Sequence, residues 1–177
     1  MKIQEIKNLK EEIQAGKIFI YPTDTIYGLG CDATNEESIN KIKEIKQRDK
    51  NKPLSIIAPS IKWIENNFII DSNLEKYLPG PYTLILKKKN PIFLKHISNS
   101  ETIGVRIPKN KLTKEIQKSD VPFVTTSVNL AGESFALRIE DIKQEILDKV
   151  DYIIEAEEDL SGKPSTLIIN NKEISRN

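Results

Sequence analysis

A short basic segment is the first part of this sequence whose residue types suggest chemistry. Lys46, Arg48, Lys50 and Lys52 lie within seven residues, with Asp49 as the only acidic residue among them. A multiply charged anion such as a triphosphate would relieve their mutual repulsion. The alternative is a helix C-terminus, where one or two cations each contribute about 0.3–1 kcal/mol. The pattern alone leaves both interpretations open.

Polar side chains also lie at the ends of several apolar segments. They are Thr23, Asp24 and Thr25 after KIFIY, Arg106 in GVRIP, and Thr126, Ser127 and Asn129 after VPFV. In open α/β sheets, ligands bind outside the strand ends, because loop side chains and backbone donors converge there. We therefore expect these segments to meet at one pocket. For any single residue, the alternative is a local role in capping or turning the chain.

The sequence contains few of the residue types that build metal centres or covalent catalytic sites. Cys31 is the single cysteine, so neither an intrachain disulfide nor a cysteine-based zinc spacing is possible. His96 is the single histidine, and its segment KHISNS predicts a surface loop. Gly28 and Gly30 lack the third glycine of a dinucleotide fingerprint, and no GxxxxGKS/T loop occurs. A bound nucleotide would therefore not be held by a P-loop.

The elements that must position these residues alternate between helices and strands. The spacing of Ile39, Ile42 and Ile45 predicts a helix that begins after Asn35 and runs into the basic segment. Further helices are predicted over 1–16, 61–68, 72–78, 111–118 and 139–150. Apolar runs predict strands over 17–21, 54–58, 82–87, 104–108, 121–129, 151–155 and 165–170, with a loop through the glycines that follow 17–21. This alternation predicts an α/β or α+β fold in one domain.

Length and charge limit the classes of function. At 177 residues the chain has the size of one domain, and its formal net charge at pH 7 is +1. A generic nucleic-acid-binding protein would carry a stronger positive field, so anion recognition must come from a local patch. The N-terminal segment lacks the apolar core of a signal peptide, and no run approaches the roughly 20 apolar residues that span a membrane. We expect a cytoplasmic protein with no membrane partner.

Six motifs occur together in one order along the chain: YPTDTIYGLGCDA, KQRDKNKPLSIIA, PGPYTLIL, TIGVRIP, TTSVNLAG and GKPSTLII. As an ordered set they resemble the YrdC-like family, and the resemblance runs from about Ile18 to Arg176. It implies a single YrdC-like domain over 1–177, with an α/β fold made of a twisted, open, mixed sheet, flanking helices and a concave basic groove. The chain is similar to the short, single-domain threonylcarbamoyl-AMP synthases of that family.

The resemblance also implies a reaction. Such enzymes condense L-threonine, bicarbonate or CO2, and ATP to threonylcarbamoyl-AMP and pyrophosphate, with Mg²⁺ bridging the phosphates. Partner proteins then transfer the threonylcarbamoyl group to tRNA, at the adenosine beside the anticodon. Weak RNA binding is a further expectation. The alternative is a non-catalytic RNA-binding or ribosome-associated protein that uses the same groove for phosphates. A third interpretation is carbamoyl transfer from carbamoyl phosphate, as in related domains of hydrogenase maturation proteins.

Matching the motifs residue by residue implies roles for individual side chains. The residues at positions that bind ATP in the family are Lys46, Arg48, Lys52, Thr102, Asn129 and Arg176. The residues at positions that hold threonine are Thr25, Arg106, Ser127 and Ser165. By the same resemblance, catalysis would depend on Lys46, Arg48, Ser127 and Asn129, with no metal ligand from the protein. An arginine suits the threonine carboxylate, because its planar guanidinium can donate two parallel hydrogen bonds.

Overall fold

The computed structural model describes residues 1–49, 51–71 and 73–175, in which helices and strands alternate. The helical elements are η1 (Ile3–Glu5), α1 (Leu9–Gln14), α2 (Glu36–Ile45), α3 (Ile61–Asn67), α4 (Leu74–Tyr77), α5 (Lys111–Gln117), η2 (Ile139–Asp141) and α6 (Gln144–Leu147). The strands are β1 (Phe19–Pro22), β2 (Tyr27–Gly30), β3 (Ser55–Ile57), β4 (Phe68–Ile69), β5 (Tyr82–Lys88), β6 (Thr102–Arg106), β7 (Phe123–Ser127), β8 (Tyr152–Ile153), β9 (Thr166–Ile169) and β10 (Lys172–Ile174).

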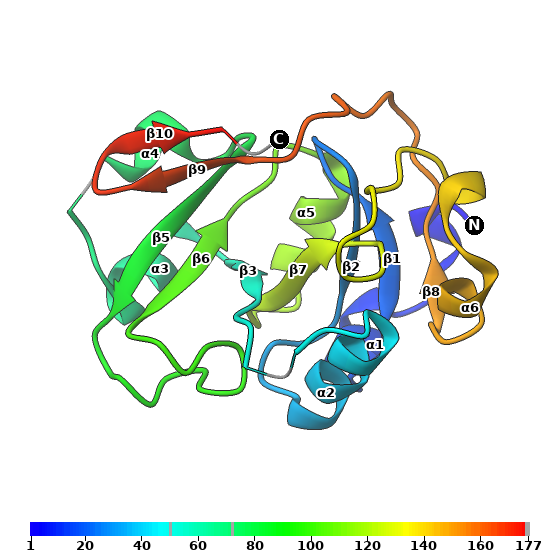
Figure 1. Cartoon of the computed structure of the whole chain (residues 1–177), viewed down its shortest axis with the longest axis horizontal. Helices are drawn as coiled ribbons and strands as arrows, with labels where there is room; N and C mark the ends of the chain where they lie inside the picture. Colours follow the sequence, from blue (N-terminus) through cyan, green and yellow to red (C-terminus); the bar gives the residue numbers. More distant parts are fainter. Residues whose placement is uncertain (50, 72, 176–177) are drawn as a thin grey trace.

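The described strands form one mixed sheet in the order β10-β9-β5-β6-β3-β7-β2-β1-β8, and β4 pairs with β5 outside this path. Within it, β3 pairs with β6, β5 with β9 and β1 with β8 in parallel, and the other pairs are antiparallel. Strands β5, β6, β9 and β10 lie to one side of the central pair β3 and β7, and β1, β2 and β8 lie to the other (Figure 1). The predicted mixed α/β sheet with flanking helices is confirmed. That residues 1–177 make up a single domain stays a prediction.

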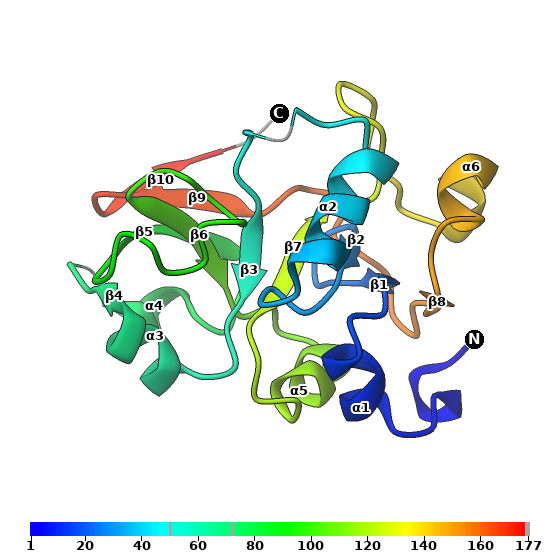
Figure 2. The same cartoon turned by 90° about the horizontal axis from the view of Figure 1, so that it is seen from below.

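Two apolar clusters pack on opposite faces of the sheet. On one face, Ile42 of α2 packs with Ile56 of β3, in a cluster that also holds residues of α3 and α4. On the other face, Ile13 of α1 and Ile116 of α5 pack with Ile57 of β3. Ile56 and Ile57 are neighbours but belong to different clusters, because successive strand side chains point to opposite faces. Figure 2 shows α1 and α5 side by side on their face.

Strand β2 occupies the segment where the glycines predicted a loop. The ring of Tyr21 on β1 lies against this strand, and a Cβ atom at Gly28 would come within 2.9 Å of the tyrosine Cζ. A Cβ atom at Gly30 would overlap the carbonyl oxygen of Val124 on β7. The loop prediction was wrong because these two glycines permit close packing between strands and do not make a turn.

Two predicted helices are each divided in the structure. Over 1–16, Asn8 adopts a left-handed conformation with a φ of 56° and separates η1 from α1. Over 139–150, Ile142 and Lys143 are extended and separate η2 from α6. Ile142 is buried in the core, so tertiary packing overrides the helical pattern there.

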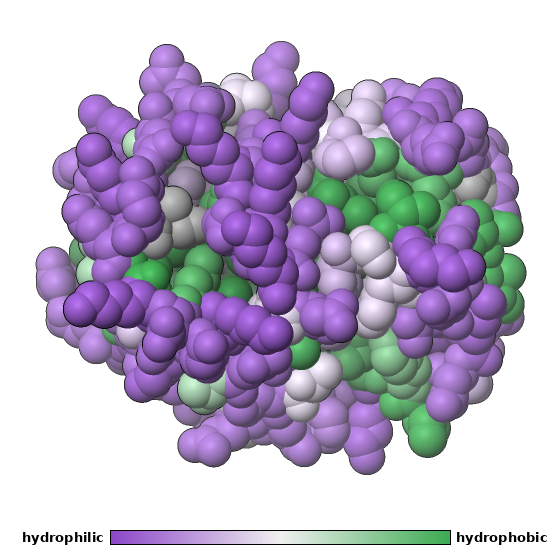
Figure 3. Space-filling view, turned by 180° about the vertical axis from the view of Figure 1, so that it is seen from behind, coloured by the Kyte–Doolittle hydropathy of each residue, from purple (hydrophilic) through white to green (hydrophobic). Residues whose placement is uncertain are grey.

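The surface carries both polar and apolar regions. In the part of the chain that the structure describes, no helix combines the length and apolar character needed to cross a membrane. Seen from behind, exposed hydrophobic side chains gather mainly on the side that carries α3 and α4 (Figure 3). Ile69 and Ile92 are the most exposed large hydrophobic residues that the structure describes, at 48% and 72%.

Candidate functional site

A pocket of about 250 Å³ opens where the two groups of strands meet. Its lining comes from β2, β3, β5, β6 and β7, from the turn between β1 and β2, from the segments before β3 and before β9, and from the loop after β7. Residues with hydroxyl groups dominate this lining: Thr23, Thr25, Tyr27, Ser55, Thr83, Thr125, Thr126, Ser127 and Ser165. Of the strand-end residues that we expected to meet at one pocket, Asp24 and Asn129 do not line it. The others do line it: Thr23, Thr25, Arg106, Thr126 and Ser127.

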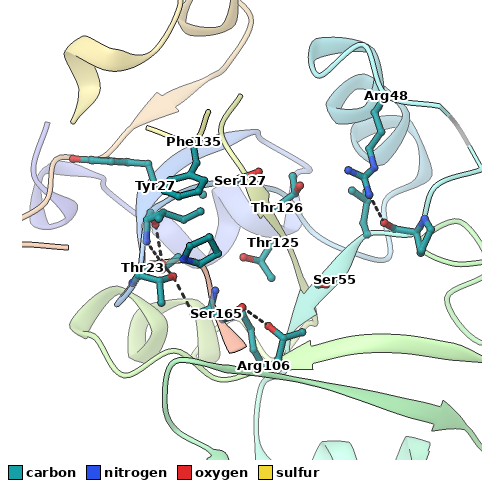
Figure 4. Close-up of a pocket in the computed structure, with 17 residues that line it drawn as sticks. Thr23, Tyr27, Arg48, Ser55, Arg106, Thr125, Thr126, Ser127, Phe135 and Ser165 are labelled. Atoms are coloured by element: carbon teal, nitrogen blue, oxygen red, sulfur yellow. Dashed lines mark hydrogen bonds between the residues drawn. The ribbon is translucent and has the colours of Figure 1, made fainter. Parts of the chain in front are cut away.

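Two arginines give the pocket its charge. Figure 4 shows Arg48 and Arg106 on opposite sides, with Ser55 and Thr125 between them. Among the described residues that line the pocket, none is an aspartate or a glutamate. The pocket therefore suits a ligand, or a pair of ligands, with negative charge at two separated places.

Arg106 is buried at the end of β6. Its Nη2 donates to Oδ1 of Asp24 at 2.6 Å and to Oγ1 of Thr25 at 3.5 Å. Burial lowers the pKa of this guanidinium, and the neighbouring carboxylate of Asp24 opposes that change. Its Nε is buried and, within the described residues, has no hydrogen-bond partner. That unpaired donor can be satisfied by an anionic ligand.

Asp24 fixes Arg106 in place, a role that the sequence did not reveal. One carboxylate oxygen accepts from Arg106, and Oδ2 accepts from the backbone N–H of Lys109 at 3.0 Å. Asp24 thus ties the turn after β1 to the segment after β6. In the sequence, Asp24 stood out only as one of several polar residues at a strand end, and no spacing rule links it to a residue 82 positions away.

Pairs of hydroxyl groups organise the side of the pocket near Arg106. Oγ1 of Thr25 lies 2.8 Å from Oγ1 of Thr23. Ser165 directly precedes β9, and its Oγ lies 2.7 Å from Oγ1 of Thr83 on the neighbouring parallel strand β5. Thr25 and Ser165 were predicted from the sequence, whereas Thr83 was not, because it lies within the apolar run of its strand. These pairs hold hydroxyl groups in fixed directions.

Arg48 provides a cation that has no acidic partner among the described residues. Its Nη2 donates to the carbonyl oxygen of Pro53 at 2.9 Å, and its Nε is buried without a partner in that part of the chain. Burial lowers the pKa of this guanidinium. A partly desolvated cation of this kind attracts an anion strongly, because no carboxylate has to be displaced first.

The end of α2 explains where the basic segment points. The helix is capped at its start by Asn35, whose side chain accepts from the Ser38 N–H at 3.0 Å. At its end, Gln47 adopts a left-handed conformation with a φ of 49°. The N–H of Arg48 then bonds to the carbonyl of Lys43 at 2.9 Å, which is the pattern of a Schellman motif. The turn directs Arg48 toward the pocket.

Lys46 points inward from the same turn. It is 2% exposed, and its ammonium donates to the carbonyl oxygens of Ser127 and Asn129 and to the Asn129 side chain. Burial and, next, the charge of Arg48 lower its pKa to about 7. The structure therefore places Lys46 beneath the end of β7 and outside the residues that line the pocket.

The remaining predicted residues lie at different distances from the pocket. Ser127 lines it, and Asn129 lies next to Ser127 without lining it. Thr102, at the start of β6, and Lys52 are also outside the lining. Arg176 lies outside the described residues. The roles predicted for all of these side chains stay predictions.

The single cysteine and the single histidine lie outside the lining of this pocket. Among the described residues, no group of three or more His, Cys, Asp or Glu side chains is arranged to hold a metal ion. Cys31 is buried, and burial raises the pKa of its thiol far above the ordinary value. His96 lies outside the pocket lining, with Nδ1 at 3.0 Å from Glu36.

Comparison with known sequences places the chain in a family. The family model Sua5/YciO/YrdC, described as telomere recombination, matches residues 11–177. A Methanocaldococcus jannaschii protein provisionally named threonylcarbamoyl-AMP synthase is 42% identical over 164 residues, covering 90% of this chain and 77% of that protein. The threonylcarbamoyl-AMP synthase of Vibrio campbellii is 27% identical over 173 residues, covering 93% of this chain and 94% of that protein.

Comparison with solved structures leads to the same family as comparison with known sequences. The chain is similar to P. abyssi Sua5 complexed with L-threonine, with a TM-score of 0.78 and 28% identity over 90% of this chain, and it spans 49% of that protein. It is also similar to E. coli YciO, with a TM-score of 0.74 and 27% identity, covering 90% of this chain and 81% of that protein. Sequence and structure together show that the protein belongs to the Sua5/YciO/YrdC family.

Proposed function

We propose that this protein is an L-threonylcarbamoyladenylate synthase, which condenses L-threonine, bicarbonate or CO2, and ATP to threonylcarbamoyl-AMP and pyrophosphate. The observation that carries the proposal is the pocket with Arg48 and Arg106 on opposite sides and hydroxyl groups between them. Curated relatives named threonylcarbamoyl-AMP synthase, and a structural neighbour complexed with L-threonine, support it.

Threonine would bind at the Arg106 side. The guanidinium receives the carboxylate through the donor that has no partner in the described protein, while Asp24 holds its other side. Hydroxyl groups of Thr25, Ser127 and Ser165 orient the amine and the side chain of the substrate. All four of these residues line the pocket, which supports their assignment to one ligand.

ATP would bind at the Arg48 side. Arg48 and Lys52 contact the phosphates, and Lys46 adds positive charge from beneath the end of β7. Thr102, Asn129 and Arg176 complete the proposed nucleotide contacts. Mg²⁺ would enter with ATP and would neutralise part of the phosphate charge, since this ion is usually held by substrate oxygens and few protein ligands.

The reaction needs alignment more than a covalent nucleophile. The neutral amine of threonine adds to CO2 with loss of a proton, or condenses with bicarbonate with loss of water, and so forms a carbamate. An oxygen of the carbamate then attacks the α-phosphorus of ATP in line as pyrophosphate leaves. Both reactants are anions, so the protein must neutralise and orient them. Two cations on opposite sides of one pocket are suited to that task.

The product would pass to proteins that transfer the threonylcarbamoyl group to tRNA, and the protein would act in the cytoplasm. We expect weak RNA binding in addition to this role. A purely RNA-binding role is less well supported, since nonspecific RNA affinity comes from many phosphate contacts and the net charge is only +1.

Pyrophosphate release tests the proposal directly. The chain is incubated with ATP and Mg²⁺, with and without L-threonine and bicarbonate, and the product is identified by mass. Release that requires both co-substrates and yields the mass of threonylcarbamoyl-AMP supports the synthase. Release that needs carbamoyl phosphate in place of threonine and bicarbonate indicates carbamoyl transfer. A folded chain with no turnover and salt-dependent RNA binding indicates the RNA-binding alternative.

A further inference from the structure

The ammonium of Lys46 is buried, and its hydrogen bonds go to one short segment. Its Nζ donates to the carbonyl oxygen of Ser127, to the carbonyl oxygen of Asn129 at 2.8 Å and to Oδ1 of Asn129 at 3.0 Å. A lysine ammonium has three N–H groups and no acceptor. The three oxygens of the 127–129 segment therefore match its three donors.

A hydrogen bond within the same segment connects the atoms held by Lys46 to a residue that lines the pocket. Oγ of Ser127 donates to Oδ1 of Asn129 at 2.6 Å, which is the oxygen that Lys46 also holds. Ser127 lines the pocket. The N–H of Ala131 donates to the carbonyl oxygen of Lys46 at 3.0 Å, so the backbone of the turn is attached to this segment as well. The ammonium of Lys46 thus fixes the side-chain amide of Asn129, and this amide in turn fixes the hydroxyl group of Ser127.

We propose that Lys46 is a positioning residue, which holds Ser127 and Asn129 in the geometry that L-threonine requires and does not contact the phosphates of ATP. The inference rests on the proposed function, in which Ser127 contacts threonine. A phosphate contact would draw N–H groups away from the part-buried carbonyl oxygens of Ser127 and Asn129, which these groups now satisfy. Arg48 can bind a phosphate without giving up a hydrogen bond from its Nε, because this atom has no partner in the described structure.

The variant Lys46→Met tests the inference, because methionine is of similar length and cannot donate. Calorimetric titration of the full chain measures its affinity for L-threonine and, separately, for ATP with Mg²⁺. We expect the affinity for threonine to fall at least tenfold, and the affinity for ATP to change less than threefold. A loss of ATP affinity larger than the loss of threonine affinity would overturn the inference.

A double-mutant cycle shows whether Lys46 acts through the serine. Ser127→Ala and Lys46→Met are each expected to lower the affinity for L-threonine. The affinity of the double variant should be about the same as that of the single variant with the lower affinity. If the two fold-changes multiply, Lys46 and Ser127 act independently and the inference fails.

Lys43→Met is the matched control on the same helix. Lys43 is also buried, at 7% exposed, and its Nζ donates to the carbonyl oxygen of His96 at 2.9 Å, away from the pocket. We expect this variant to keep wild-type affinity for both ligands. A loss of threonine affinity equal to that of Lys46→Met would mean that any buried lysine on α2 has this effect, which contradicts a specific role for Lys46.

Lys46→Arg covers the case in which the methionine variant does not fold. Arginine keeps the charge, but its planar head cannot place three N–H groups on the same three oxygens. We expect weaker threonine binding with ATP binding retained, whereas unchanged threonine affinity overturns this inference alone. A wild-type chain that binds neither ligand would instead contradict the proposed function, and the inference with it.

Discussion

Arg106 and Asp24 form an ion pair that water hardly reaches. Their side chains are 7% and 13% exposed, and the two interacting atoms lie 2.6 Å apart. A buried guanidinium without a counter-ion is costly, because it has lost its hydration. The pair therefore keeps a cation available at the proposed threonine side of the pocket while the rest of the fold stays stable.

Removing the carboxylate of this pair should be strongly destabilising. We expect Asp24→Ala to lower the free energy of unfolding by about 3–5 kcal/mol, measured by urea denaturation, because it leaves a buried charge unpaired. Glu115→Ala is the control, since it breaks an exposed pair with Lys118 and should change stability far less. If the two variants lost the same free energy of unfolding, the buried ion pair would contribute no more to stability than the exposed one.

Arg48 and Arg138 offer a second matched comparison at the residue scale. Arg48 lines the pocket without an acidic partner in the described structure, whereas Arg138 is exposed and pairs with Asp141. We expect Arg48→Ala to weaken ATP binding roughly 10- to 100-fold, as the loss of hydrogen bonds to a charged group predicts. Its affinity for L-threonine should be retained, as measured by calorimetry. Arg138→Ala should bind both substrates with wild-type affinity. An unchanged affinity for ATP in Arg48→Ala would contradict the role of Arg48 in ATP binding.

Helix α2 and its final turn decide where the basic segment acts. The apolar face of the helix, with Ile39, Ile42 and Ile45, packs in the core. Because the turn after Lys46 reverses through a left-handed residue, Lys46 points into the protein and Arg48 points to the pocket. One local backbone feature thus separates two basic residues that are only two positions apart.

The left-handed conformation of Gln47 can be tested by itself. Gln47 is exposed, so a substitution there acts mainly through the backbone. We expect Gln47→Ile to lower the free energy of unfolding by about 1–2 kcal/mol, because a β-branched residue is poorly accommodated at positive φ. Lys41→Ile, at an exposed helical position, should cost much less in the same denaturation experiment. If both variants lose the same stability, the backbone at Gln47 is not strained.

At the scale of the whole molecule, the pocket depends on strands from both sides of the sheet. Thr25 follows β1 and Ser127 ends β7, whereas Arg106 ends β6 and Ser165 precedes β9. The two groups of strands meet where β3 pairs with β7. A ligand that contacts all four residues therefore links both groups.

Substrates should consequently stabilise the entire fold. Ligand at 100 times its dissociation constant adds about 2.7 kcal/mol to the free energy of unfolding, if it binds only the native state. We expect L-threonine, and separately ATP with Mg²⁺, to raise the unfolding temperature measured by calorimetry. D-threonine is the control, because a pocket with fixed hydroxyl groups should discriminate against the wrong stereoisomer. An equal shift with both stereoisomers would argue against a specific threonine site.

Much of the site could be predicted because its residues occur in short motifs. Thr25, Arg48, Arg106, Ser127 and Ser165 were predicted and line one pocket. Strand β2 was missed, since glycine at close strand packing looks like glycine in a turn. Thr83 was missed because a threonine within an apolar strand carries no local signal. The partnership of Asp24 with Arg106 was missed because the two residues meet only through the sheet.

The sequence by itself determined the fold class, the family and the types of side chain available for anion binding, because apolar periodicity and ordered motifs are local properties of the chain. Tertiary structure alone decided the direction of each side chain. Lys46 and Arg48 look alike in the sequence, yet one is bonded beneath β7 and the other lines the pocket. The reason is physical: burial, hydrogen-bond partners and neighbouring charges arise from residues far apart in the sequence, and these set the direction and pKa of a side chain.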